Sequence, residues 1–332
     1  MRAVAVAAFK AEPALVHVPK PEPGAGEILV KVEFAALNPY DWKVADGLLD
    51  GQAPHVFPLV MGVDFAGRVD VVGPGEHRFV VGDRVYGQVS RPPVGAGTYA
   101  EYVTVPQDSA LAGVPDTLDL RTAATLPTSG MTAAQILQNG AVLRPGQSLL
   151  IVGAAGGVGS VLTQLAAARE VRVIAAVRGD ERERMAKLGA ATTVDTTEEP
   201  LESRVRAQYP EGVDAVVDLV SSTPDAFAAH ARLVRPGGTA LTTRYVADPA
   251  LVPAGVEAVN FGLKASAALL DTLAAAAATG DLKVPVDAEL PLEKAPQALA
   301  QNRSGGARGK TVFAVRFGND PETAVPRTPR SR

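Results

Sequence analysis

The feature that most constrains the fold is a glycine-rich segment, Gly153-Ala-Ala-Gly-Gly-Val-Gly159, which follows the short all-apolar run Leu149–Val152. Such a run is typical of a strand buried on both faces of a parallel sheet. Glycines allow a sharp turn, a close approach to a pyrophosphate and tight packing of the next helix, whose N-terminus favours phosphate groups. The segment therefore predicts a strand, a dinucleotide-binding loop and a helix to about Ala168. A tight strand–helix turn without a ligand is the alternative.

Strand-like and helical runs alternate through the rest of this region. The expected strands are Val171–Val177, Thr192–Asp195, Val213–Leu219 and Thr239–Thr243, with a helix from Asp180 to Leu188. Alternation of this kind is typical of βαβ units in a doubly wound parallel sheet. Residues 123–262 are therefore predicted to form an α/β domain of the Rossmann type.

The first third of the chain has a different pattern. Ile28, Val30, Val32 and Phe34 alternate with their neighbours as in a half-buried strand, and short strands continue between Gly/Pro turns. Residues 1–122 are therefore predicted to form a compact, partly closed β-barrel.

The last part of the chain changes pattern again near Phe261. Residues 263–317 contain an expected helix, Lys264–Thr279, another around Glu293–Gln301, and a final strand, Thr311–Phe317, that we expect to return to the first domain. Residues 318–332 have little to bury, and we expect a disordered tail.

Composition excludes several function classes. The chain has no cysteine and four histidines, none within metal-motif spacing of another, so we expect no metal site. Net charge is −4 without a long basic stripe, which argues against nucleic-acid binding. The longest late apolar run, Ala265–Ala278, contains Asp271 and is shorter than the about 20 residues that cross a membrane. We expect a cytoplasmic protein that does not enter the membrane.

Separated segments match one family in order. They are Ala36–Asp41, Gly62–Gly67, Val81–Val85, Tyr99–Tyr102, Leu126–Ala133, Gly153–Gly159 with Gln164, Leu188–Ala190 and Arg308–Val312. On these segments the chain resembles the medium-chain dehydrogenase/reductase superfamily, in its zinc-free quinone oxidoreductase and enoyl or alkenal reductase branch. The resemblance implies a GroES-like catalytic domain, a Rossmann domain that binds the cofactor, and an active site between them.

The resemblance also bears on the chemistry. Zinc-dependent members carry a Gly-His-Glu segment and a catalytic cysteine, whereas this chain reads Gly62-Val-Asp64 and has no cysteine. Without a Lewis acid to stabilise an alkoxide, we expect hydride addition to an electron-poor C=C bond or a quinone.

The resemblance implies a set of cofactor-binding residues. It places Ala154, Ala155, Gly156, Gly157 and Val158 along the pyrophosphate, Thr132 near the nicotinamide ribose, Thr242 and Thr243 near the nicotinamide, and Lys310 within reach of the cofactor.

Cofactor choice depends on the end of the second Rossmann strand. An acid there binds the ribose 2′-OH of NAD, whereas cationic or small polar groups accept the 2′-phosphate of NADP. Arg178 comes first and Arg182 follows one helical turn later, which favours NADPH. Asp180 and Glu181 point the other way, unless they begin the next helix.

The catalytic candidates lie in the Asn-Pro-x-Asp segment. The resemblance places Asn38 and Asp41 along the nicotinamide and substrate pocket. Hydride addition to an enone leaves an enolate that needs a hydrogen-bond donor and a proton. Lys43 is the expected donor, and Tyr40 is the second choice. Tyr245 and water are the alternatives. The tyrosine that many enoyl reductases of this branch carry after the asparagine is replaced by Leu49.

Three functions remain open. The first is NADPH-dependent reduction of a small-molecule enone or enoyl substrate, the second is quinone reduction, and the third is NADPH binding without catalysis. We also expect a homodimer joined through edge strands within Leu233–Phe261, as in relatives of this branch.

Overall fold

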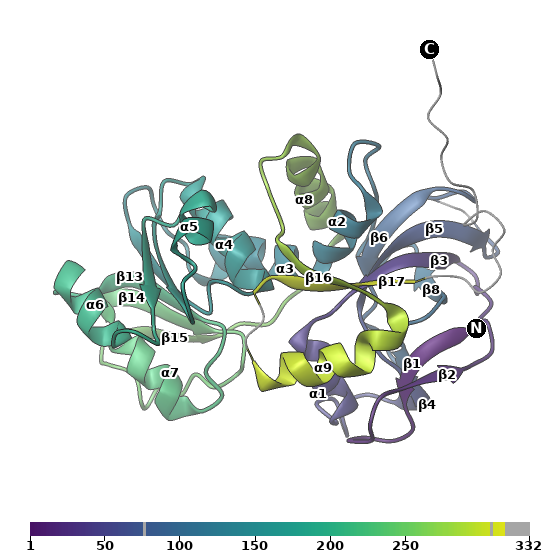
Figure 1. Ribbon diagram of the computed structural model, residues 1–332, viewed down its shortest axis with the longest axis horizontal. Helices are drawn as coiled ribbons and strands as arrows, with labels where there is room; N and C mark the ends of the chain where they lie inside the picture. Colours follow the sequence, from purple (N-terminus) through teal and green to yellow (C-terminus); the bar gives the residue numbers. More distant parts are fainter. Residues whose placement is uncertain (76–77, 306–307, 316–332) are drawn as a thin grey trace, which may run out of the picture.

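The computed structural model describes residues 1–75, 78–305 and 308–315. Figure 1 shows two halves side by side, one built on a parallel sheet with flanking helices and one built mainly of antiparallel strands.

The first half is a six-stranded sheet in which every neighbouring pair is parallel. Its strands, in spatial order, are β12 (Thr192–Asp195), β11 (Arg172–Val177), β10 (Ser148–Val152), β13 (Val213–Asp218), β14 (Val234–Thr242) and β15 (Glu257–Asn260). This is the strand order of a doubly wound Rossmann sheet, and the predicted fold is confirmed. The order reverses between β10 and β13, and ligands of such sheets bind at the carboxyl ends of the strands there.

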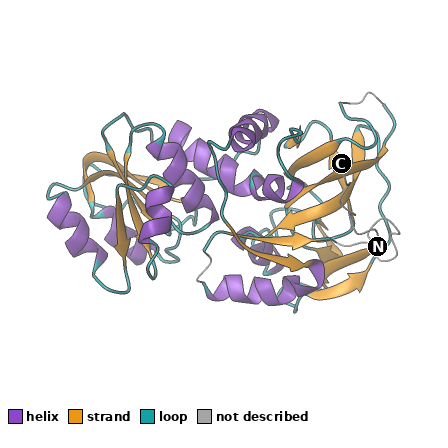
Figure 2. Cartoon of the chain, turned by 45° about the horizontal axis from the view of Figure 1, so that its top comes forward, coloured by secondary structure: helices purple, strands orange, loops and turns teal. Residues whose placement is uncertain are grey.

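Helices cover both faces of this sheet, as Figure 2 shows. They are α4 (Gly157–Ala167), α5 (Arg182–Lys187), α6 (Leu201–Gln208) and α7 (Pro224–Ala231). Successive residues of β10 point to opposite faces of the sheet. Ile151 belongs to the same core cluster as Val161 of α4, and Leu150 belongs to the same core cluster as Phe227 of α7. Burial on both faces explains why β10 contains only apolar residues apart from its first.

The second half contains two sheets, where the sequence predicts a partly closed β-barrel. One sheet contains β2 (Ala14–His17), β1 (Arg2–Val6), β4 (His55–Val60) and β7 (Val94–Ala96), in that order. The other contains β16 (Val286–Pro291), β17 (Lys310–Ala314), β3 (Glu27–Ala36), β5 (Asp64–Val72), β6 (Arg84–Gln88) and β9 (Leu111–Gly113), and β8 (Tyr102–Pro106) also pairs with β3. Val4, Val30, Tyr99 and Phe313 meet in the core between these sheets.

A shared core joins the halves. The connecting elements are α2 (Leu120–Thr125), α3 (Pro127–Gln135), the π-helical turn η1 (Ile136–Gly140) and α8 (Ala267–Thr279). Three further elements, α1 (Pro39–Ala45), the 3-10 turn η2 (Leu292–Lys294) and α9 (Ala295–Ser304), pack on the barrel core. One apolar cluster extends from Ala66 and Tyr86 of the barrel, through α2, α3 and α8, to Leu149 and Ile151 of β10. The final strand, β17, pairs antiparallel with β3, so the chain returns to the barrel.

One detail of the sequence interpretation is wrong. The alternation from Ile28 to Phe34 predicts that the neighbouring residues Leu29 and Ala35 lie on the outer face of a half-buried strand, yet both are buried. The reason is that β3 lies inside its sheet between β5 and β17, and α2 packs against it.

Other expectations are not tested by the structure. The boundaries 1–122, 123–262 and 263–317 stay a prediction, and the tail 318–332 lies outside the described residues, as do Arg316 and Phe317 of the expected last strand. No helix in the described ranges is long and apolar enough to cross a membrane.

The packing of α4 on β10 generates the first prediction. A Cβ on Gly159 would lie 2.5 Å from the Gly153 carbonyl oxygen and 2.6 Å from the Ala154 Cα, whereas a Cβ on Gly113 would meet nothing within 4 Å. Because backbone cannot move aside cheaply, Gly159→Ala should lower the free energy of unfolding by about 1–3 kcal/mol, and Gly113→Ala should not. Urea unfolding of both variants checks this. Equal stability of the two variants would contradict it.

Candidate functional site

The glycine segment forms the turn between β10 and α4. Gly153 has φ +88°, a conformation that favours glycine, and Gly156 is the N-cap of α4 with an extended backbone. No side chain caps α4, so its first amide groups remain free to bind an anion. Free amides at the switch point of a Rossmann sheet fit a dinucleotide pyrophosphate.

Three arginines gather at the carboxyl end of β11. Arg184 donates hydrogen bonds to the Ala155 carbonyl at 3.0 Å and to the Arg308 carbonyl at 2.7 Å. The Arg308 guanidinium lies against Gly179, where a Cβ would be 3.1 Å from it, and Arg178 is exposed next to them with its guanidinium near Gly305. This arginine group, defined as Arg178, Arg184 and Arg308, combines two distant segments beside the loop.

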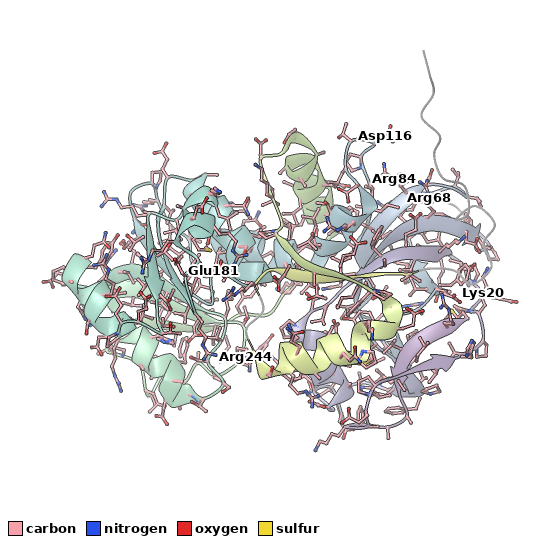
Figure 3. All side chains as sticks on the ribbon, in the orientation of Figure 1. Lys20, Arg68, Arg84, Asp116, Glu181 and Arg244 are labelled. Carbon is pink, nitrogen blue, oxygen red and sulfur yellow. The ribbon has the colours of Figure 1, made fainter. Side chains whose placement is uncertain are left out.

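The two acids after β11 are engaged with neighbours. Glu181 is buried and pairs with Arg184 at 2.7 Å and Arg308 at 3.2 Å. The Asp180 carboxylate is exposed and accepts from the Arg182 amide at 3.3 Å. Figure 3 shows Glu181 on the side of the Rossmann half that faces the barrel.

A buried polar network lies between the glycine segment and the barrel. Lys310 Nζ donates to Asn38 Oδ1 at 2.6 Å and lies 3.6 Å from Asp64 Oδ2. Asn38 Nδ2 donates to Asp64 Oδ2 at 2.9 Å, and Thr128 donates through Oγ1 to Asp64 Oδ1 at 2.6 Å. We call Asn38, Asp64, Thr128 and Lys310 the Asp64 network.

The Asp64 network touches the glycine segment. A Cβ on Gly157 would lie 2.8 Å from both Lys310 Cδ and Ser129 Oγ, so only glycine lets the loop lie this close. Burial raises the pKa of Asp64 and lowers that of Lys310, and the attraction between their charges opposes both shifts. The pair is therefore costly to break at one side only.

Asp41 is a second buried carboxyl group in the same region. Its Oδ2 accepts hydrogen bonds from the Tyr99 hydroxyl at 2.6 Å and from the backbone amide of Asn38 at 2.7 Å. Its Oδ1 is buried and has no hydrogen-bond partner among the described residues. Burial raises the pKa of Asp41 to about 7, and the hydrogen bonds from Tyr99 and the Asn38 backbone amide oppose that rise.

A cavity of about 110 Å³ opens beside Asp41 in the barrel half. Tyr40 and Asp41 are among the residues that line it, and apolar residues such as Leu49, Met61 and Val89 make up most of the rest. Burial raises the pKa of Tyr40, so its hydroxyl keeps its proton at neutral pH. Lys43 lies one helical turn further along α1 and is not among the lining residues.

The remaining sequence candidates lie around the carboxyl ends of the strands. Thr132 is buried in α3, and Thr242 is the last residue of β14, where its Oγ1 accepts from the Arg244 amide at 3.0 Å. Thr243 follows directly. Ala154, Ala155 and Val158 lie in or directly after the glycine turn.

Sequence reasoning assigned no role to Asp64, Thr128, Tyr99 or Arg308. Asp64 stands between Val63 and Phe65 at the start of a strand, and an acid among apolar residues is a signal for a buried, paired charge. Within the described ranges, no group of three histidines and carboxylates is placed to hold a metal ion.

Comparisons with known proteins agree with this architecture. The alcohol dehydrogenase GroES-like domain family matches residues 24–116, and a family described as zinc-binding dehydrogenase matches residues 188–313. The chloroplast envelope quinone oxidoreductase homolog of Arabidopsis thaliana is 30% identical over 309 residues, covering 90% of this chain and 92% of the relative.

Two further relatives are informative. The 2-methylene-furan-3-one reductase of Solanum lycopersicum is 31% identical, covering 90% of this chain and 74% of the relative. A mycobacterial protein solved in complex with NADPH superposes with a TM-score of 0.81 at 29% identity, covering 95% of this chain and 99% of that chain. The chain therefore belongs to the medium-chain dehydrogenase/reductase superfamily, among its quinone oxidoreductase-like members.

Proposed function

We propose that the protein uses NADPH to reduce the electron-poor C=C bond of an α,β-unsaturated carbonyl compound. One observation carries the proposal: an unbroken series of contacts leads from the cofactor loop to an apolar cavity. Gly157 packs on Lys310, Lys310 binds Asn38, and Asn38 binds Asp41, which lines the cavity with Tyr40. These contacts would hold a cofactor bound at the loop next to a substrate bound in the cavity.

The residues present fit a bound NADPH. The α4 amides would hold the pyrophosphate, and the arginine group would hold the 2′-phosphate. Asp180 and Glu181 are the acids that argue for NAD. Glu181 already pairs with Arg184 and Arg308, which supports NADPH, whereas the Asp180 carboxylate is exposed and lies 4.0 Å from Arg182. The NADPH complex of the mycobacterial relative supports the same choice. When bound, the cofactor supplies two electrons as a hydride to the β-carbon.

The chain's own groups would manage the charge that develops on the substrate. Without a cysteine or the Gly-His-Glu segment, the means of stabilising an alkoxide is missing, so the acceptor must carry charge on its own carbonyl. The Tyr40 hydroxyl would donate a hydrogen bond to that oxygen as the enolate forms. The Asp41 carboxyl group, with a pKa of about 7, would hold the proton that completes the saturated product.

Quinone reduction is the second candidate, supported by the quinone oxidoreductase-like relatives. It needs the same cavity and cofactor but no protonation at carbon. The enone proposal has its own support in the tomato relative, whose name describes an enone substrate. NADPH binding without catalysis is the least supported alternative, because the cavity adjoins ionisable groups with shifted pKa values.

NADPH deuterated at the transferable hydrogen distinguishes these functions. After dialysis against EDTA, we expect oxidation of NADPH with enones and deuterium at the β-carbon of the product by NMR. Turnover with quinones alone would select the second candidate. Activity that EDTA abolishes and zinc restores would contradict a zinc-independent reductase.

Arg178→Ala should weaken the binding of NADPH but not the binding of NADH. The loss of a charge-assisted hydrogen bond to the 2′-phosphate costs about 1.5–3 kcal/mol, so NADPH binding should weaken about ten- to a hundredfold with NADH binding unchanged. Arg172→Ala is the matched control, because Arg172 is exposed at the opposite end of β11. Dissociation constants from fluorescence titration test this. An equal loss for both cofactors would refute the assignment.

Tyr40→Phe should lower turnover with enones while NADPH affinity stays the same. Removal of a donor that acts on a developing oxyanion costs about 2.7–4 kcal/mol. Tyr209→Phe removes a hydroxyl after α6, away from the cavity, and serves as the control. Steady-state kinetics with both variants measures the effect. Unchanged turnover in Tyr40→Phe would show that another group stabilises the oxyanion.

A further inference from the structure

A histidine–aspartate pair lies at the carboxyl end of β13, outside the Asp64 network. His230, in the last turn of α7, has its Nδ1 2.7 Å from Oδ2 of Asp218, the last residue of β13. The Asp218 side chain is fully buried, and 24% of the His230 side chain is exposed. Because an ionised carboxylate can only accept, Nδ1 of His230 carries the hydrogen of this bond. A residue of a helix thus supplies a donor to a buried acid at the end of an inner strand.

The same aspartate holds the turn that follows β13. Its Oδ1 accepts hydrogen bonds from the backbone amides of Val220 and Ser221, both at 2.9 Å. The Ser221 hydroxyl lies 3.4 Å from His230 Nδ1. Burial acts to raise the pKa of Asp218, but hydrogen bonds from His230 and Ser221 hold that pKa below its ordinary value. One buried acid therefore links α7 to residues 219–222, which we call the β13 turn.

The β13 turn packs directly on the glycine segment. A Cβ on Gly153 would lie 2.6 Å from Val220 Cγ1 and 3.6 Å from Leu219 Cβ, so the turn and the segment approach closely. The Leu219 amide also donates to the carbonyl of Val152, directly before Gly153, at 3.1 Å. Gly153 has φ +88°, so the β13 turn lies against the point where the chain bends toward α4. Displacement of this turn would remove a support of that bend.

The helix that carries His230 is anchored in the sheet. Phe227 of α7 is fully buried and belongs to the same core cluster as Val216 of β13. His230 follows Phe227 by three residues, so both side chains lie on the side of the helix that faces the sheet. The histidine is therefore held in place as a donor. The contacts lead from α7 through Asp218 to the switch point, where ligands of such sheets bind.

We propose that His230 is a positioning residue of the dinucleotide site, which acts through Asp218 to hold the β13 turn against Gly153 and keep the glycine segment in its binding conformation. The proposal rests on the cofactor part of the proposed function. It concerns the pyrophosphate, which NADPH and NADH share. Loss of His230 should therefore weaken both cofactors equally, unlike loss of Arg178. A role in stability alone is the alternative.

The test compares three variants of His230 in the full chain. His230→Ala removes the donor, and His230→Leu removes it while filling the space. His230→Asn retains a donor, because the amide nitrogen of asparagine occupies the place of the histidine Nδ1. Dissociation constants of NADPH and NADH are measured by fluorescence titration, with urea unfolding alongside. The Ala and Leu variants should bind both dinucleotides about tenfold more weakly, and His230→Asn should restore most of the affinity.

Arg235→Ala is the matched control. Arg235 donates from Nε to Oδ1 of Asp214 at 2.9 Å, so this pair also joins a carboxylate of β13 to a cationic side chain. It lies at the amino end of the strand, however, away from the glycine segment. Arg235→Ala should lower the midpoint of urea unfolding and leave both dissociation constants unchanged.

The outcomes separate the positioning role from stability and from the proposed reaction. Unchanged affinity in the Ala and Leu variants, no recovery in His230→Asn, or an equal loss in Arg235→Ala would overturn the positioning role. Weaker binding of NADPH alone would overturn it as well. A wild-type protein that binds neither dinucleotide would overturn both proposals. The expected pattern of binding, without hydride transfer to enones or quinones, would uphold the positioning role and refute the proposed reductase function.

Discussion

The buried contact of Lys310 with Asn38 and Asp64 is the interaction on which the rest of the site depends. Lys310 and Asn38 are 272 residues apart in the chain. Asp64 also accepts hydrogen bonds from Thr128, so the starts of β17, α1, β5 and α3 meet at one point. A charge left alone here would cost several kcal/mol, because the interior solvates it poorly. The charges of Lys310 and Asp64 are therefore stabilised only while all four segments stay in place.

This network also places the cofactor loop relative to the barrel. The stem of Lys310 lies against Gly157, so the loop of one half rests on a residue of the other. The apolar cluster through α2, α3 and α8 continues the same junction. Because close-packed cores resist small displacements, these contacts oppose movement of the loop relative to the cavity. In the reaction that we propose, the reacting atoms must meet at short range.

Asp41 and Asp64 show how environment gives two buried carboxyl groups different roles. Asp64 faces a cation and several donors, and its charge holds segments together. Asp41 accepts from neutral donors only and keeps one buried oxygen without a partner, and burial raises its pKa to about 7. Around Asp64, the cation and the donors favour the charged form against the effect of burial, whereas Asp41 is suited to exchange a proton near neutral pH.

The sequence by itself determined the parallel half and its loop. The spacing of glycines after an apolar strand is a local signal, and it predicted β10, α4 and their relation correctly. The sequence patterns did not predict the short elements. One of them is α1, although it has an asparagine N-cap, a proline as its first residue and an acid three residues after the cap. Seven residues are too few for a helical period to appear. Likewise β4 contains Pro58, and its strand character comes from pairing with β1.

Only the tertiary structure decided which charges meet. Arg308 joins Arg178 and Arg184, and Lys310 pairs with Asp64, in each case from distant parts of the chain. Composition and spacing identify such residues, but they do not show how far apart the residues lie in the folded chain. The reason is physical, because the energy of a charge depends on its burial and its neighbours, and both arise only when the two halves pack together.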